Sequence, residues 1–104
     1  MDIHLILDEH QGFQWDKGNS LKSWLKHRVT EGEAEQVFFN EPLLLSEDEV
    51  HSQQESRFRA LGHTDGEKYL FIVFTVRKDL IRIISARDMN KKEREAYEKH
   101  KTNT

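Results

Sequence analysis

Three arginines recur at five-residue intervals in the last third of the chain: Arg77, Arg82 and Arg87. The residues between them form two apolar runs, and folding alone does not require a cation at these places in a hairpin that should otherwise be core. A guanidinium group stays protonated at physiological pH and donates two parallel hydrogen bonds to a phosphate. The types and the spacing of these residues therefore predict a phosphate-binding site.

The elements that must position these arginines are three strands, which alternation of apolar and polar residues predicts over residues 57–63, 68–77 and 80–86. The two-residue link at 78–79 predicts an antiparallel hairpin from the last two strands, although it lacks the glycine usual in such a turn.

In the register of this hairpin Thr75 faces Arg82 and Arg77 faces Leu80, so the hydroxyl and two arginines share one sheet face. The opposite face is apolar and is expected to be core; it carries Phe74, Val76, Ile81 and Ile83.

Helices are predicted before and after these strands in the sequence. Asp16 is suited to cap a helix over residues 17–27, and Thr30 with Glu33 forms a capping box for a second helix that ends before Pro42. Asn90 caps a last helix that runs to about residue 101.

Shorter elements complete the chain. Residues 13–15 are expected to be extended, and residues 1–7 to form either a strand or a loosely held arm. We further predict a short strand at 43–45 and a mobile acidic loop at 46–56. Trp15 and Trp24 are expected in the core.

Composition limits the class of protein. A chain of 104 residues without internal repeats predicts one domain, and the absence of cysteine excludes disulfides and thiolate chemistry. There is no secretory signal pattern and no apolar stretch of membrane-spanning length, so a soluble cytoplasmic protein is expected. The six histidines show no i, i+4 pair and no accompanying carboxylate pattern, so neither a metal nor a cofactor is expected.

The net charge of −3 hides an asymmetry. Residues 1–56 carry four Lys or Arg against twelve Asp or Glu, a net charge of −8, whereas residues 57–94 carry ten against five, a net charge of +5. The basic half predicts a surface that faces a polyanion, with ordinary solvated faces as the alternative.

An ordered set of motifs resembles the BrnT family of bacterial type II toxin-antitoxin toxins, over residues 13–99. The set comprises Phe13 to Asp16, Lys26-His27, residues 34–42 (AEQVFFNEP), His51-Ser52, Glu55 with Arg57, Leu61-Gly62, Thr75 with Arg77, residues 81–87 (IRIISAR), and Glu93-Arg94 with Tyr97. The chain departs from the family pattern at Asn19, Ser23, Arg28 and Lys68.

The resemblance implies an α+β fold similar to RelE-type ribonucleases: two N-terminal helices, a mostly antiparallel sheet of four or so strands, and a C-terminal helix. It implies a toxin that cleaves RNA and stops translation. The implied partner is a BrnA-like antitoxin with a ribbon-helix-helix part, in a hetero-oligomer that binds operator DNA through the antitoxin and represses its own operon.

The chemistry such residues could support is metal-independent RNA cleavage, in which the 2′-hydroxyl attacks the adjacent phosphate. Arg57, Arg77 and Arg82 are the candidates for clamping the substrate and stabilising the transition state. Proton transfer is assigned to His27, with His51 and Glu55 as further candidates, and Tyr97 is expected to act as an acid or to stack on a base. The expected substrate-binding residues are Lys26, His51, Glu55, Arg59, Thr75 and Arg87.

Each assignment has an alternative. The arginines could pair with acids such as Glu55, His27 could interact with the dipole at its helix end, and Tyr97 could be a packing residue. Arg87 could anchor the start of the last helix. At the level of function, the alternative is a catalytically weak or inactive binding module that acts with its antitoxin in operon autoregulation.

Overall fold

The computed structural model describes residues 12–51 and 55–102. The predicted strand or arm at residues 1–7 lies outside them. In chain order the elements are β1 (Gly12–Trp15), α2 (Lys17–His27), α3 (Glu31–Val37), β2 (Leu44–Glu47), the 3₁₀ helix η1 (Glu49–His51), β3 (Phe58–His63), β4 (Tyr69–Arg77), β5 (Leu80–Asp88) and α4 (Lys91–Thr102).

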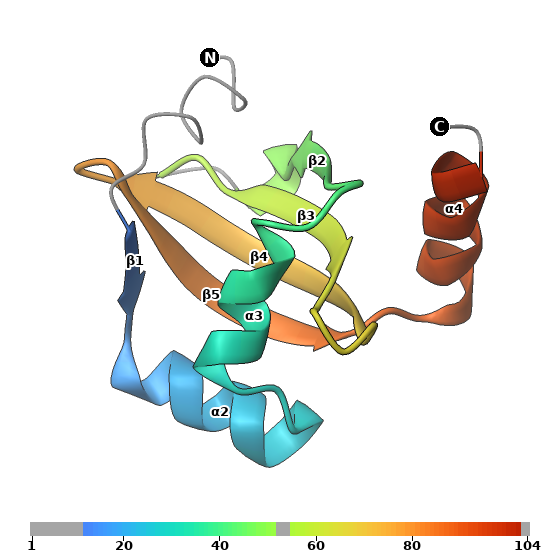
Figure 1. Cartoon of the computed structure of the whole chain (residues 1–104). Coiled ribbons are helices and arrows are strands. Elements are labelled where there is room, and N and C mark those ends of the chain that lie inside the picture. Colours follow the sequence, from blue (N-terminus) through green and yellow to red (C-terminus); the bar gives the residue numbers. More distant parts are fainter. Residues whose placement is uncertain (1–11, 52–54, 103–104) are drawn as a thin grey trace.

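The strands form one five-stranded sheet in the order β1-β5-β4-β3-β2 (Figure 1). β1 pairs with β5 in parallel, and the other neighbours are antiparallel. The α+β class, the helix order and the mostly antiparallel sheet are therefore confirmed. Within the described residues, no helix is long and apolar enough to cross a membrane.

The predicted helix caps are all present. The Asp16 carboxylate accepts hydrogen bonds from the backbone N–H groups of Gly18 and Asn19 at the start of α2. Thr30 and Glu33 form a reciprocal capping box at α3, and Asn90 and Glu93 exchange the same pair of bonds at α4. Local side-chain chemistry thus fixes where each helix begins.

The β4–β5 hairpin has the predicted register, with Thr75 opposite Arg82 and Arg77 opposite Leu80. Lys78 and Asp79 both adopt positive φ, at 49° and 65°, which is the geometry of a type I′ turn. A bulge between Val73 and Phe74 lies farther along the hairpin. Because the turn matches the twist of the strands, it closes the hairpin without glycine.

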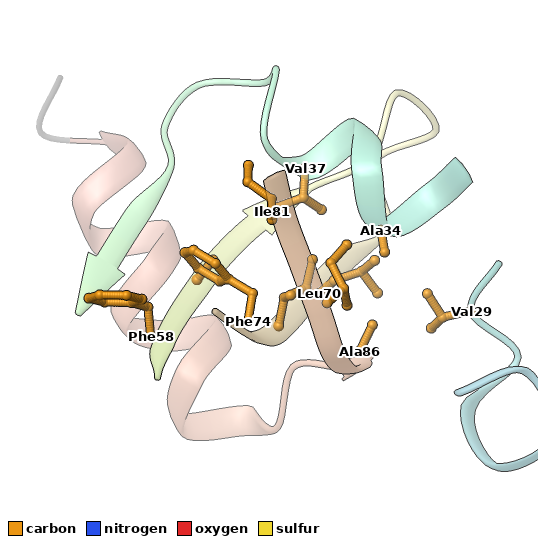
Figure 2. Packing of buried hydrophobic residues seen from close by; sticks show 11 residues of the cluster. Val29, Ala34, Val37, Phe58, Leu70, Phe74, Ile81 and Ala86 are labelled. Carbon is orange, nitrogen blue, oxygen red and sulfur yellow. The ribbon is translucent and has the colours of Figure 1, made fainter. Parts of the chain in front are cut away.

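The core lies between one face of the sheet and α3 (Figure 2). Phe74 is fully buried, and its ring meets that of Phe38 edge-on at a centroid distance of 5.0 Å. Val37 reaches the sheet at Gly62, where a β-carbon would lie only 2.5 Å from a Val37 methyl group. α3 therefore packs on the face that carries the even-numbered residues of β3.

Gly62 tests how closely α3 packs on the sheet. We expect Gly62→Ala to lower the free energy of unfolding by about 1–3 kcal/mol, because the added methyl group would displace Val37 in a packed core. Urea unfolding measures this loss. The control is Gly32→Ala, where the new methyl group meets nothing within 4 Å in the first turn of α3 and stability should rise by up to about 1 kcal/mol. Equal effects of the two changes would contradict this packing.

α4 packs on the opposite face of the sheet, where it is held by Tyr97. The Tyr97 hydroxyl donates to the Pro42 carbonyl at 2.7 Å, so its contact of 2.7 Å with His63 is an acceptance from the Nδ1–H group. The Tyr69 ring lies 5.3 Å away, edge-on. Since α4 covers only this end, the rest of the face stays open toward the hairpin turn (Figure 1).

Tyr97→Phe is expected to destabilise the protein by about 1–3 kcal/mol, because it leaves the Pro42 carbonyl and His63 without their buried partner. Chemical unfolding followed by circular dichroism gives the value. Tyr69→Phe is the matched control: its hydroxyl is only partly buried, accepts from Lys101 at 3.3 Å, and should change stability by no more than about 0.5 kcal/mol. If Tyr97→Phe were equally neutral, the hydroxyl would not hold α4.

Two predictions about the fold are wrong. Trp24 is 43% exposed instead of lying in the core, and with Leu21 and Leu25 it forms an apolar stripe on α2 that faces solvent. The small Ser23 is buried in its place. The acidic segment 46–56 is also more structured than a mobile loop, because Ser46 and Glu47 belong to β2 and η1 follows; its residues 52–54 are not described.

Candidate active site

The predicted arginines line the open sheet face, on the side away from α3. Arg59 projects from β3, Arg77 from β4 and Arg82 from β5, while Arg57 immediately precedes β3. Alternation explains this arrangement, because the residues on either side of Arg59 and Arg82 enter the core and Arg77 follows Val76, which packs against the core. The sheet thus separates an apolar face from a cationic one.

Glu55 is the negative centre of this face. Arg77 donates to both of its carboxylate oxygens, at 2.5 Å from Nε and 3.2 Å from Nη2. These hydrogen bonds, aided by the positive charges of Arg77, Arg82 and Arg57, hold the pKa of Glu55 below its ordinary value. All three predicted clamp residues therefore lie within electrostatic reach of one carboxylate.

Arg82 is held by the first turn of the N-terminal helix. Its Nη2 lies 3.6 Å from Oδ2 of Asp16, the residue that also caps α2. Only 24% of the Arg82 side chain is exposed, so its position is defined by the sheet and by this contact. The Asp16 pairing was not anticipated from the sequence, in which Asp16 appears only as a helix cap.

Arg87 lies farther along β5, at the end of the face that α4 covers. Its two terminal nitrogens bind the Glu93 carboxylate at 2.8 and 3.0 Å, and its guanidinium stacks over Phe71 at 4.1 Å. Burial acts to raise the pKa of Glu93, but hydrogen bonds from Arg87 and from the Asn90 backbone outweigh it and the pKa is lowered. Arg87 thus anchors the start of α4, which is the alternative role considered for it above.

A groove runs along the cationic face between these two ends. One hollow of about 430 Å³ is lined by Asp48, Val50, Arg57, Arg59, Phe71, Val73, Ile84 and Ser85. An adjoining hollow of about 290 Å³ shares Arg59 and Phe71 with it and reaches Leu44 and Glu93. Arg59 is oriented by a hydrogen bond of 3.2 Å to the Glu47 carbonyl. The groove therefore combines cations at its rim with an aromatic and aliphatic floor.

Phe71 is the residue of this groove that sequence reasoning missed. The alternation of β4 could have revealed it, because Phe71 lies on the same face as Arg77, with Val73 and Thr75 between them. The Phe71 ring is half-buried and already carries the Arg87 guanidinium, so it contributes apolar surface to the floor of the groove and is not a free platform for a base.

Four predicted site residues are not part of the exposed cationic surface. Lys26 and His27 are exposed at the end of α2, separated from Asp16 by the helix length of about 16 Å. Thr75 is buried despite its position on the arginine face, because its hydroxyl donates to the Ser56 carbonyl at 2.7 Å. Tyr97 is fully buried and its pKa is raised to about 12, chiefly by burial and secondarily by Tyr69.

These positions favour the alternative roles of His27, at its helix end, and of Tyr97, as a packing residue. His27, like Lys26, lies in the last turn of its helix, where a cation interacts favourably with the helix dipole. Tyr97 has no exposed ring surface for a base and holds α4 in place. His51 ends η1 next to Val50, which lines the groove.

Comparison with known proteins agrees with the earlier resemblance. A family model described as the ribonuclease toxin BrnT of type II toxin-antitoxin systems matches residues 15–93. The crystal structure of the Brucella abortus ribonuclease toxin BrnT is similar in fold, with a TM-score of 0.58 and 16% identity, and the alignment covers 77% of this chain and 97% of that one. Among curated proteins no match is found. Because the family model extends from the end of β1 to the first turn of α4, the chain belongs to the BrnT family of ribonuclease toxins of type II toxin-antitoxin systems.

Proposed function

We propose that this chain is a metal-independent endoribonuclease that inhibits translation in the cytoplasm and is neutralised by a BrnA-like antitoxin. The observation that carries the proposal is the cluster of Arg57, Arg77 and Arg82 around Glu55 on the open sheet face. It combines fixed positive charge with one carboxylate, which is what cleavage of a phosphodiester needs when no metal takes part.

In the proposed reaction the 2′-hydroxyl oxygen of a ribose attacks the adjacent phosphorus and the bond to the 5′-oxygen breaks. Glu55 takes the proton of the 2′-hydroxyl. The arginines stabilise the charge that develops on the non-bridging oxygens, and the leaving 5′-oxygen receives a proton, for which His51 is the candidate donor. The products are a 2′,3′-cyclic phosphate and a 5′-hydroxyl.

Glu55 becomes a stronger base when RNA binds. In the free protein the hydrogen bonds from Arg77 lower its pKa and make it a weak base. A bound phosphate competes for Arg77 and brings negative charge close to the carboxylate, and both effects raise the pKa of Glu55. The substrate thus prepares the group that accepts its proton.

The experiment is incubation of the purified protein with single-stranded RNA in excess EDTA. We expect fragments ending in 2′,3′-cyclic phosphate, and growth arrest with loss of bulk RNA when the chain is expressed without its antitoxin. Intact RNA together with harmless expression would contradict the proposed activity.

A second candidate function, a binding module with weak or no activity, is favoured by one observation. Each of the three hairpin arginines already has a carboxylate partner: Arg77 pairs with Glu55, Arg82 with Asp16, and Arg87 with Glu93. RNA must compete with these carboxylates. This alternative predicts co-purification with the product of a neighbouring reading frame and binding of operator DNA by the complex, without RNA cleavage.

A further inference from the structure

α2 exposes an unusually apolar surface for a short surface helix. Leu21, Trp24 and Leu25, which we call the α2 patch, lie at i, i+3 and i+4 and are 57%, 43% and 60% exposed. A groove of about 380 Å³ runs beside the patch toward the start of α3 and is lined in part by Val29. Contiguous exposed apolar surface of this kind marks a binding site for another macromolecule.

The charged residues of α2 itself are all lysines. All four Lys and Arg of residues 1–56 lie between positions 17 and 28, and no Asp or Glu occurs from 17 to 30. Lys22 and Lys26 are exposed on α2 itself, and Lys17 lines the groove, with Glu31 as an acid at its far end. The patch is therefore basic within an otherwise acidic half of the chain.

The chemistry of the α2 patch suits a protein helix better than RNA. RNA binding uses cations and free aromatic faces, but the Trp24 ring already carries the Arg28 guanidinium at 5.1 Å from its centroid. The two exposed leucines offer nothing that a phosphate or a base recognises. A ridge at i, i+3 and i+4 is the shape that packs against the apolar side of a second helix.

We propose that the α2 patch is the docking surface for an acidic amphipathic helix of the antitoxin, a proposal that rests on the proposed partnership. Apolar side chains of that helix lie on Leu21 and Leu25 and enter the groove beside Trp24. Its acidic side chains face Lys22 and Lys26. α2 packs against β5 and begins at the Asp16–Arg82 pair, so this surface is separate from the groove but lies next to Arg82.

The test measures affinity for the product of the neighbouring reading frame by isothermal titration calorimetry. We expect the double variant Leu21→Ser with Leu25→Ser to bind about 100-fold more weakly, because it removes the apolar centre of the interface. Phe39→Ser removes a comparably exposed apolar side chain, 68% exposed, two residues after α3 and should leave the affinity unchanged. Melting temperatures confirm that each variant is folded.

Charge is tested by Lys22→Glu with Lys26→Glu, expected to weaken binding about 10-fold at low salt and less at high salt. Lys91→Glu with Lys92→Glu, on exposed positions of α4, changes the net charge equally and should have no effect. Full affinity in both α2 double variants would overturn this proposal alone, whereas no binding by the wild type would overturn the partnership as well. Lost affinity for single-stranded RNA, or dissociation of a homodimer, with antitoxin binding unchanged, would assign the patch to RNA or to a second copy instead.

Discussion

Replacing Arg82 by alanine is expected to reduce RNA cleavage by about 100- to 1,000-fold, because one preorganised cation that stabilises the transition state is removed. The Arg82 side chain is only 24% exposed, and its Nη2 lies 3.6 Å from the Asp16 carboxylate. Its charge also contributes to the lowered pKa of Glu55. The rate is measured on a short labelled RNA in EDTA, and the same change should abolish growth arrest.

Arg94→Ala is the matched control for this prediction. Arg94 is an exposed arginine of α4 that stacks on Tyr69. Tyr69 lies six residues, or about 20 Å, along β4 from Thr75, the residue opposite Arg82. The effect of Arg94→Ala on the rate should be less than about threefold. Equal losses in the two variants would show that overall charge, not the clamp, supports cleavage. Full activity of Arg82→Ala would show that Arg82 does not take part in cleavage.

The hairpin could be predicted from the sequence because its determinants are local. A two-residue link fixes the register, and alternation then fixes the face of each side chain. The same reasoning placed the arginines together. It named Glu55 as a possible partner but could not supply Asp16, because Asp16 comes from a segment distant in sequence whose position depends on the tertiary fold.

Thr75 and the α2 stripe show where local patterns fail. Thr75 lies on the predicted face, but residues 55–57 pass over it and take its hydroxyl bond through Ser56. Periodicity predicts that α2 has an apolar side without saying which side meets the sheet. The sheet accepts the small Ser23 because it lets the helix approach β5 closely, and this leaves the larger side chains outside.

Glu55→Gln separates the two roles that the central carboxylate can have. The change keeps the shape of the side chain and removes its charge. If Glu55 accepts the proton of the 2′-hydroxyl, we expect kcat to fall by about 100- to 10,000-fold. KM should fall at the same time, because Arg57, Arg77 and Arg82 lose a competitor for the phosphate. Single-turnover cleavage and RNA binding give the two quantities separately.

The dependence on pH adds a second readout for Glu55. Its pKa in the free protein is lowered from the ordinary value of 4.5, so the carboxylate is ionised at neutral pH and kcat/KM should not fall on account of this group until the pH drops below that value. The kcat profile reports the RNA complex, where the bound phosphate raises the pKa, and its acidic limb should therefore lie at higher pH. Glu95→Gln, an equal charge change at an exposed position of α4, should leave both profiles unaltered. A Glu55→Gln protein that cleaves faster than the wild type would show that the carboxylate only restrains the arginines, and the base would then have to be sought elsewhere on the cationic face.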